Sequence, residues 1–281
     1  MEYKKCTLTD LPDMYKAFID SFSDYIIPMK MDCRTFISHM FRQEHNAAEH
    51  SFLAYDGGRP VGVILGGIRT YEHVLSMRCG TLGVIPPYRG TGVSAALLEL
   101  HKQEARKENC RRCVLEVIQG NARAEGFYLK HGYKADKTLR YFKKTVGRPQ
   151  AIDYPVTMKA LDHSAFLNII KTIAYFPIDW QSETAFLYPD PEIHTLGAFI
   201  NHLPTGVIAY SASGKICFLW VAPEFRRRGI AAFLIEKAAE TGCLSELSIT
   251  VSGNPLLENF ILQNGFLKLN LAQTQMKTVV N

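Results

Sequence analysis

The sequence predicts a mixed α/β fold arranged as two tandem domains, and three observations lead to this prediction. The chain has 281 residues, which exceeds the usual span of one compact domain. Two local patterns occur once in each half of the chain. The spacing of apolar residues alternates between the two-residue period of strands and the 3.6-residue period of helices.

Four elements are expected at the start of the chain: a strand Tyr3 to Leu8, a helix Asp10 to Phe22, and two strands Ser51 to Tyr55 and Val61 to Ile68. The helix begins where Thr9 or Asp10 can serve as its N-cap. The two later strands flank Asp56-Gly57-Gly58, whose glycines allow positive φ, so they form a hairpin.

A change of period places the next elements. Cys79 to Val84 is an apolar strand, whereas the apolar residues from Val93 onward fall on one helical face, so the junction lies between Pro86 and Gly92. The last three elements of this half are a strand Val114 to Ile118, a helix Ala122 to Lys130 and a strand Tyr133 to Lys144. This order predicts a mixed sheet with helices.

The second half repeats two segments of the first in the same order: Val84 to Val93 returns as Val221 to Ala231, and Asn121 to Tyr133 returns as Asn254 to Phe266. The comparison pairs Gly90 with Gly229, 139 residues later. A polar stretch with Pro and Gly, residues 145–154, separates the two copies. It predicts domains of residues 1–148 and 149–281.

The composition excludes several classes of protein. No segment reaches the roughly 18 apolar residues of a membrane span, so we expect a cytoplasmic protein without a membrane partner. The formal charge of +5 is modest and no basic block is interleaved with aromatics, which argues against nucleic acid as a partner. Cys110-Arg-Arg-Cys113 has no second cysteine or histidine pair, so no metal site is expected.

The junction between the strand ending at Val84 and the following helix predicts an anion site. Free backbone N–H groups and the positive end of the helix dipole meet there. Gly90 and Gly92 let a diphosphate approach the backbone closely, and Arg89 adds a positive charge. The Lys and hydroxyl residue of a nucleoside-triphosphate loop are missing after Gly92.

These residues resemble the acyl-CoA diphosphate loop of the GNAT superfamily of N-acetyltransferases, whose pattern is Gln/Arg-x-x-Gly-x-Gly/Ala. Arg226, Gly229 and Ala231 fit this pattern, whereas in the first copy the leading position is read as Pro87. The segment from Asn121 to Tyr133 is similar to the other common motif of the family, Asn-x-x-Ala-x-x-Phe-Tyr-x-x-x-Gly-Phe/Tyr. Two motifs in the family's order make the resemblance specific.

The resemblance implies two tandem GNAT-like domains of α/β (α+β) class, each a mixed, mostly antiparallel twisted sheet flanked by helices. It implies acetyl-CoA (CoA) as cofactor, held partly by backbone groups where the fourth strand splays from the fifth. The implied contacts are Leu82, Gly83, Val84, Arg89, Gly90, Thr91, Gly92, Val93, Ser94 and Asn121 in the first domain, and Val221, Arg226, Arg228, Gly229, Ile230 and Ala231 in the second.

Tyr128 stands where the family often places a general acid, and a phenol can protonate a departing thiolate at neutral pH. Its alternative role is a core aromatic, and Asn121 suits either a cofactor contact or a helix N-cap. Ile261 replaces the tyrosine in the second copy, which is therefore expected to be degenerate. The candidates for a general base, Glu72, His73 and Glu116, rest on sequence proximity only.

The leading hypothesis is an acetyl-CoA-dependent N-acetyltransferase whose amine acceptor, on a small molecule or a peptide, attacks directly in a ternary complex. The alternative is a non-catalytic acyl-CoA sensor. The acceptor and a homodimeric state are left open by the sequence.

Overall fold

The computed structural model describes the whole chain apart from residues 26, 28, 148–155, 174–177 and 281. The predicted boundary at residues 148 and 149 lies outside the described residues. The described chain forms two compact units, one of residues 1–136 with 274–281 and one of residues 137–273. We call them unit 1 and unit 2.

Unit 1 contains a sheet in the order β1-β2-β3-β4-β5-β12. Neighbouring strands from β1 to β4 are antiparallel, and β4 and β5 are parallel. The strands are β1 Glu2–Lys5, β2 Ala47–Asp56, β3 Arg59–Tyr71, β4 Val74–Val84, β5 Arg112–Ile118 and the end of β12 Leu267–Val279. The helices are α1 Leu11–Ser21, α2 Cys33–Ile37, α3 Val93–Lys107 and α4 Ala122–Lys130.

Unit 2 repeats this plan, with β6-β11-β10-β9-β8-β7 as its strand order. Here β10 and β11 are parallel, whereas β6 and β11, β9 and β10, β8 and β9, and β7 and β8 are antiparallel. The strands are β6 Lys134–Thr145, β7 Thr157–Ala160, β8 Ile193–Ile200, β9 Leu203–Ser211, β10 Lys215–Val221 and β11 Glu246–Ser252. The helices are α5 His163–Lys171, α6 Trp180–Leu187, α7 Ile230–Thr241 and α8 Pro255–Gln263. The predicted mixed, mostly antiparallel fold in two copies is confirmed.

Each unit takes its last strand from the other half of the sequence. In unit 2, β6 pairs with β11 from Leu139↔Ser252 to Thr145↔Glu246. In unit 1, the Val280 amide donates to the Arg111 carbonyl oxygen at 3.1 Å, and Val280 is buried in the core. The predicted ranges follow the repeat in the sequence, whereas the compact units exchange their final strands.

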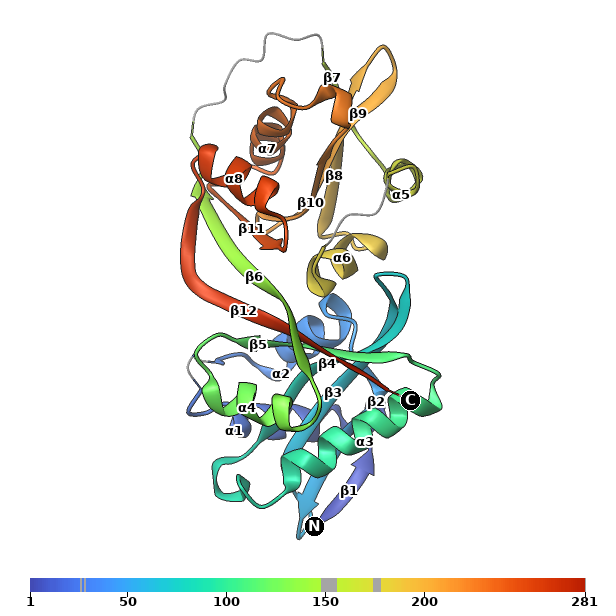
Figure 1. Cartoon of the computed structure of the whole chain (residues 1–281), viewed down its shortest axis with the longest axis vertical. Coiled ribbons are helices and arrows are strands. Elements are labelled where there is room, and N and C mark those ends of the chain that lie inside the picture. Colours follow the sequence, from blue (N-terminus) through green and yellow to red (C-terminus); the bar gives the residue numbers. More distant parts are fainter. Residues whose placement is uncertain (26, 28, 148–155, 174–177, 281) are drawn as a thin grey trace. The chain divides into compact units, whose positions relative to one another are not determined.

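In unit 1, α3 and α4 cover one face of the sheet and α1 and α2 cover the other (Figure 1). An apolar core lies on each side of the sheet. Alternate residues of a strand point to opposite faces. Phe52 and Ala54 of β2 accordingly join the core under α3 and α4, whereas Leu53 joins the core under α1 and α2. The pair α3 and α4 and the pair α1 and α2 therefore pack on opposite faces of the same strands. This packing holds α3 over the sheet.

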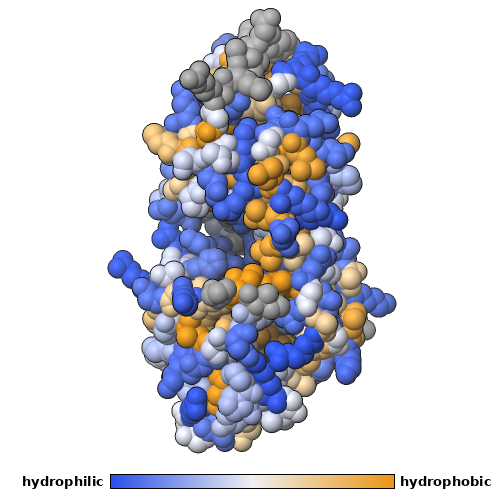
Figure 2. Space-filling model, turned by 90° about the vertical axis from the view of Figure 1, so that its left-hand side faces the viewer, coloured by the Kyte–Doolittle hydropathy of each residue, from blue (hydrophilic) through white to orange (hydrophobic). Residues whose placement is uncertain are grey.

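Large exposed apolar side chains are scattered over the surface, among them Leu8, Leu129, Leu203 and Leu256. Figure 2 shows hydrophilic residues over most of the face that it draws, with apolar residues among them. Within the described residues, every helix is too short or too polar to cross a bilayer.

Candidate acyl-CoA site

Two glycines with left-handed backbone lead into α3. Gly90 has φ +79° and Gly92, the N-cap residue, has φ +94°. A Cβ atom added at either position would meet no other atom within 4 Å, and both residues are exposed. L side chains rarely adopt these φ values, so glycine favours this turn, and its outer surface is open.

The first amides of α3 form no hydrogen bond within the part of the chain that the structure describes. Among the residues that the structure describes, no side chain caps this end of the helix. The first amide of α3 to bond backward is that of Ala96, which donates to the Gly92 carbonyl oxygen at 3.0 Å. The amides of Val93 and Ser94 therefore stand at the positive end of the helix dipole, where an anion binds well.

The guanidinium of Arg89 points inward rather than toward this anion position. Its Nε donates to the Val84 carbonyl oxygen at 3.1 Å, and its Nη2 donates to the Ser21 carbonyl oxygen at 2.9 Å. Both Nη atoms also contact the Asp24 carboxylate, at 2.6 and 2.7 Å. The hydrogen bond from Arg89 lowers the pKa of Asp24. Arg89 thus ties the glycine turn to the end of β4 and to the end of α1.

Unit 2 builds the same turn, and the comparison corrects the register read from the sequence. The Arg226 Nε donates to the Val221 carbonyl oxygen at 3.0 Å, as Arg89 does to Val84. Gly229 is the N-cap of α7 with φ +78° and therefore corresponds to Gly92, not to Gly90. The leading position of the family pattern in unit 1 is consequently Arg89, and its placement at Pro87 was wrong.

Strands β4 and β5 of unit 1 are hydrogen-bonded over only part of their length. Their pairing runs from Ser76↔Arg112 to Cys79↔Leu115, although β4 continues to Val84 and β5 to Ile118. A register shift between β3 and β4 falls at Gly80, just beyond the last pair. Leu82, Gly83 and Val84 remain paired with β3 on one side only, so their other edge can bind an extended ligand.

Unit 2 has the same splay. Strands β10 and β11 pair only at Lys215↔Ser248 and Ile216↔Ile249, and the register shift between β9 and β10 falls at Cys217. Both units therefore combine an open strand edge with a glycine-capped helix start.

Tyr128 is the buried residue of α4, with 9% of its surface exposed. Its ring contacts those of Phe127 and Tyr133, with centroids 5.3 and 5.7 Å away. Burial raises the pKa of Tyr128 well above its usual value, and nearby Cys79 and Tyr25 raise it further. Cys79 is the last residue of β4 that pairs with β5, and it belongs to the same buried core as Tyr128.

The asparagine of the second motif acts as a helix cap in both units. Oδ1 of Asn121 accepts from the Ala124 amide at 3.1 Å, and Oδ1 of Asn254 accepts from the Leu257 amide at 3.1 Å. Ile261 occupies the place of Tyr128 in unit 2 and is fully buried. Unit 2 therefore keeps the turn, the splay and the cap but has no phenol at this position.

Two of the candidate bases are engaged in ion pairs. Glu116 accepts from the Arg78 Nε at 2.8 Å, and Arg78 also donates to Glu44 at 2.9 Å. Glu72 contacts Lys277 at 2.6 Å and Arg112 at 3.1 Å. The pKa of Arg78 is raised against the opposing effect of its burial, by the charges of Glu116 and Glu44. The sequence signal for this network was an arginine inside an apolar strand, and it was overlooked.

Comparison with known proteins agrees with this geometry. Two family models match the chain, "Acetyltransferase (GNAT) family" at residues 11–133 and "Acetyltransferase (GNAT) domain" at residues 171–278. An uncharacterized N-acetyltransferase of Archaeoglobus fulgidus is 25% identical over 134 residues, 46% of this chain and 89% of the relative.

Two solved structures share the fold over the whole chain. A GCN5-related N-acetyltransferase from Sphaerobacter thermophilus has a TM-score of 0.73 at 16% identity, with 96% of its own chain covered. A tandem GNAT protein from the clavulanic acid biosynthesis pathway has a TM-score of 0.71 at 11% identity, with 99% covered. At these identities the likeness concerns the fold alone.

Proposed function

This chain belongs to the GNAT family of acetyltransferases, and from that premise we propose that unit 1 binds acetyl-CoA and transfers its acetyl group to an amine. The acceptor amine, carried by a small molecule or a peptide, attacks the thioester directly in a ternary complex. One observation carries the proposal: the helix that follows β4 begins with unpaired amides at Val93 and Ser94, and the last residues of β4 have one unpaired edge. A diphosphate and an extended pantetheine arm need that combination.

The cofactor contacts follow from this geometry. The diphosphate lies against the amides of the turn formed by Gly90, Thr91, Gly92, Val93 and Ser94. The pantetheine arm runs along the open edge of Leu82 to Val84. Arg89 and Asn121 act through the backbone they hold, since each side chain is bonded inside the protein. Acetyl-CoA supplies the activated acyl group when it is bound.

Tyr128 is proposed to donate a proton to the sulfur of the departing thiolate. Its raised pKa keeps the phenol protonated at neutral pH, which is the state that an acid requires. Because Glu72 and Glu116 are paired with cations, we assign no general base. An acceptor that arrives as a neutral amine needs only a path to release its proton to water.

Unit 2 is proposed to bind acyl-CoA without transferring the acyl group. It offers Val221, Arg226, Arg228, Gly229, Ile230 and Ala231 at the equivalent turn, but the isoleucine at 261 cannot donate a proton. The alternative hypothesis, a non-catalytic acyl-CoA sensor, therefore applies to unit 2.

The test measures thiol release from acetyl-CoA over a panel of amines, together with CoA binding by calorimetry. Gly90→Val should weaken CoA binding by about tenfold or more, because it strains the turn and fills its open surface. Gly57→Val is the matched control, since Gly57 has φ +55° at the tip of the β2–β3 hairpin and also has no neighbour within 4 Å. Tight CoA binding with no turnover on any amine would favour the sensor for both units.

A further inference from the structure

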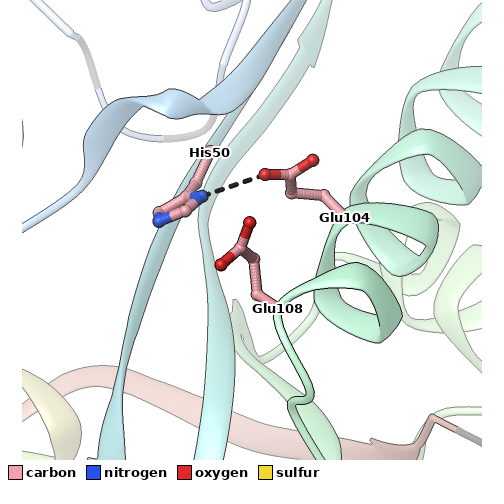
Figure 3. A group of neighbouring side chains, drawn as sticks. All are labelled: His50, Glu104 and Glu108. Atoms are coloured by element: carbon pink, nitrogen blue, oxygen red, sulfur yellow. Dashed lines mark hydrogen bonds and ion pairs between the residues drawn. The ribbon is translucent and has the colours of Figure 1, made fainter.

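Three ligand-type side chains meet at the far end of α3 in unit 1. His50 comes from β2, and Glu104 and Glu108 come from the last turn of α3 and the residue after it (Figure 3). One ligand atom from each lies within 4.8 Å of the others. The His50 Nδ1 is 3.2 Å from the Glu104 Oε1. Two ligand atoms bound to one tetrahedral zinc ion at about 2.1 Å lie about 3.4 Å from each other, which is close to this distance.

A fourth side chain, His101, is buried beside this cluster. It precedes Glu104 by one helical turn, so both residues share a face of α3. Its ring Cε1 lies 3.2 Å from the point where Gly66 would carry a Cβ, and the His50 carbonyl oxygen lies 2.2 Å from the same point. His101 thus packs next to the backbone of His50.

The imidazole of His101 is fully buried, and within the described residues neither ring nitrogen has a hydrogen-bond partner. Leaving such buried polar atoms without a hydrogen bond is unfavourable.

We propose that His50, Glu104 and Glu108 bind a divalent transition metal ion, for which zinc fits best, with the fourth position of a tetrahedral site left to water. Imidazole nitrogen and carboxylate oxygen are zinc ligands, and two carboxylates balance the charge of the ion. The prediction of no metal site rested on the missing partner pair for Cys110 and Cys113. His50 and Glu104 give no local signal in the sequence, because they stand 54 residues apart and meet only when α3 packs on β2.

Lys5 is the cation that competes for this site. Its ammonium lies 2.5 Å from the Glu104 Oε1, and 38% of its side chain is exposed. A metal ion must displace it, which a flexible exposed lysine permits. Replacing Lys5 should therefore increase the affinity for the metal ion. If Glu104 serves only to pair with Lys5, the replacement should give no metal binding.

The metal site is distinct from the acyl-CoA site. Glu108 follows Gly92 by 16 residues, so the two ends of α3 lie about 24 Å apart at 1.5 Å per residue. A bound ion would cross-link β2 to the end of α3 without contacting the thioester. The failure of one proposal therefore leaves the other intact.

The experiment uses the full chain, stripped with a chelator and dialysed, and titrated with Zn²⁺ by calorimetry and with Co²⁺ by visible absorption. We expect one ion per chain and a Co²⁺ spectrum of tetrahedral type. Glu108→Gln should weaken Zn²⁺ binding by about tenfold or more, and Lys5→Met should tighten it. Glu99→Gln, on the exposed face of α3, should leave the affinity unchanged.

Three outcomes would overturn the proposal. One is no Zn²⁺ binding by either the wild type or Lys5→Met at tens of micromolar. Another is equal affinity in wild type and in a Glu108→Gln variant that is folded by circular dichroism. The third is weaker binding in Lys5→Met.

Discussion

Replacing Tyr128 by Phe tests the chemistry assigned to unit 1. The ring stays in the core between Phe127 and Tyr133, so the packing of α4 is kept and stability should change by about 1 kcal/mol or less. Only the hydroxyl, and with it the proton donor, is removed. General acid catalysis contributes about 10²- to 10⁴-fold, which corresponds to about 3–5 kcal/mol of the activation free energy.

The assay is steady-state thiol release at saturating acetyl-CoA, with CoA affinity measured separately. We expect kcat to fall by about 10²-fold or more, while the Kd for CoA stays within about twofold. Tyr133→Phe is the matched control, because it also removes a buried phenol oxygen from the same core and should leave kcat unchanged. Undiminished turnover in Tyr128→Phe would refute the role of Tyr128 as the acid.

The pH dependence of the wild-type enzyme gives a second check on Tyr128. An acid acts in its protonated form, and burial raises the pKa of this phenol above its usual value of about 10. The donor is therefore present at every pH below the raised value and is lost only above it. A loss of kcat on an alkaline limb below about pH 10 that disappears in Tyr128→Phe would contradict the buried site.

Three further predictions concern the framework. Asp24→Asn should raise the KM for acetyl-CoA about as much as Arg89→Met does, since both loosen the turn; tighter binding in Asp24→Asn would mean that Arg89 contacts the diphosphate instead. Arg78→Met should lower the free energy of unfolding by about 3–5 kcal/mol in chemical denaturation, because it leaves the Glu116 charge buried and unpaired; Glu116→Gln together with Arg78→Met should recover part of the loss. Deletion of residues 274–281 should lower the melting temperature of unit 1, and an unchanged melting curve would show that the exchanged strand contributes nothing to stability.

Local features of the fold could be predicted because each depends on a short stretch of chain. The helix at Ala122–Lys130 was placed at its observed bounds, and the hairpin glycines and the asparagine cap were located correctly. The exchange of final strands could not be predicted. Strands β6 and β12 show the same two-residue period whichever neighbour they pair with, so the pattern does not specify the partner.

The register of the repeated turn was misread for a different physical reason. Gly90 has its structural counterpart in Arg227, which adopts φ +60° without being glycine. Arginine rarely adopts a left-handed backbone conformation. Aligning the two repeats by their glycines therefore paired Gly90 with Gly229 instead of with Arg227. The arginines at 89 and 226, which bond equivalent carbonyl oxygens, define the true register. Side-chain hydrogen bonds to backbone therefore identified the equivalence that glycine positions obscured.

The two units also show how one core position can differ in chemistry while the fold is kept. Tyr128 and Ile261 are both core residues, so isoleucine meets the packing requirement that tyrosine meets and removes only the phenol. The glycine-capped turn and the splayed strands have no such substitute, because each depends on backbone geometry that also shapes the sheet. The requirements of folding alone would therefore keep the turn and the splay in unit 2, whether or not residue 261 can donate a proton.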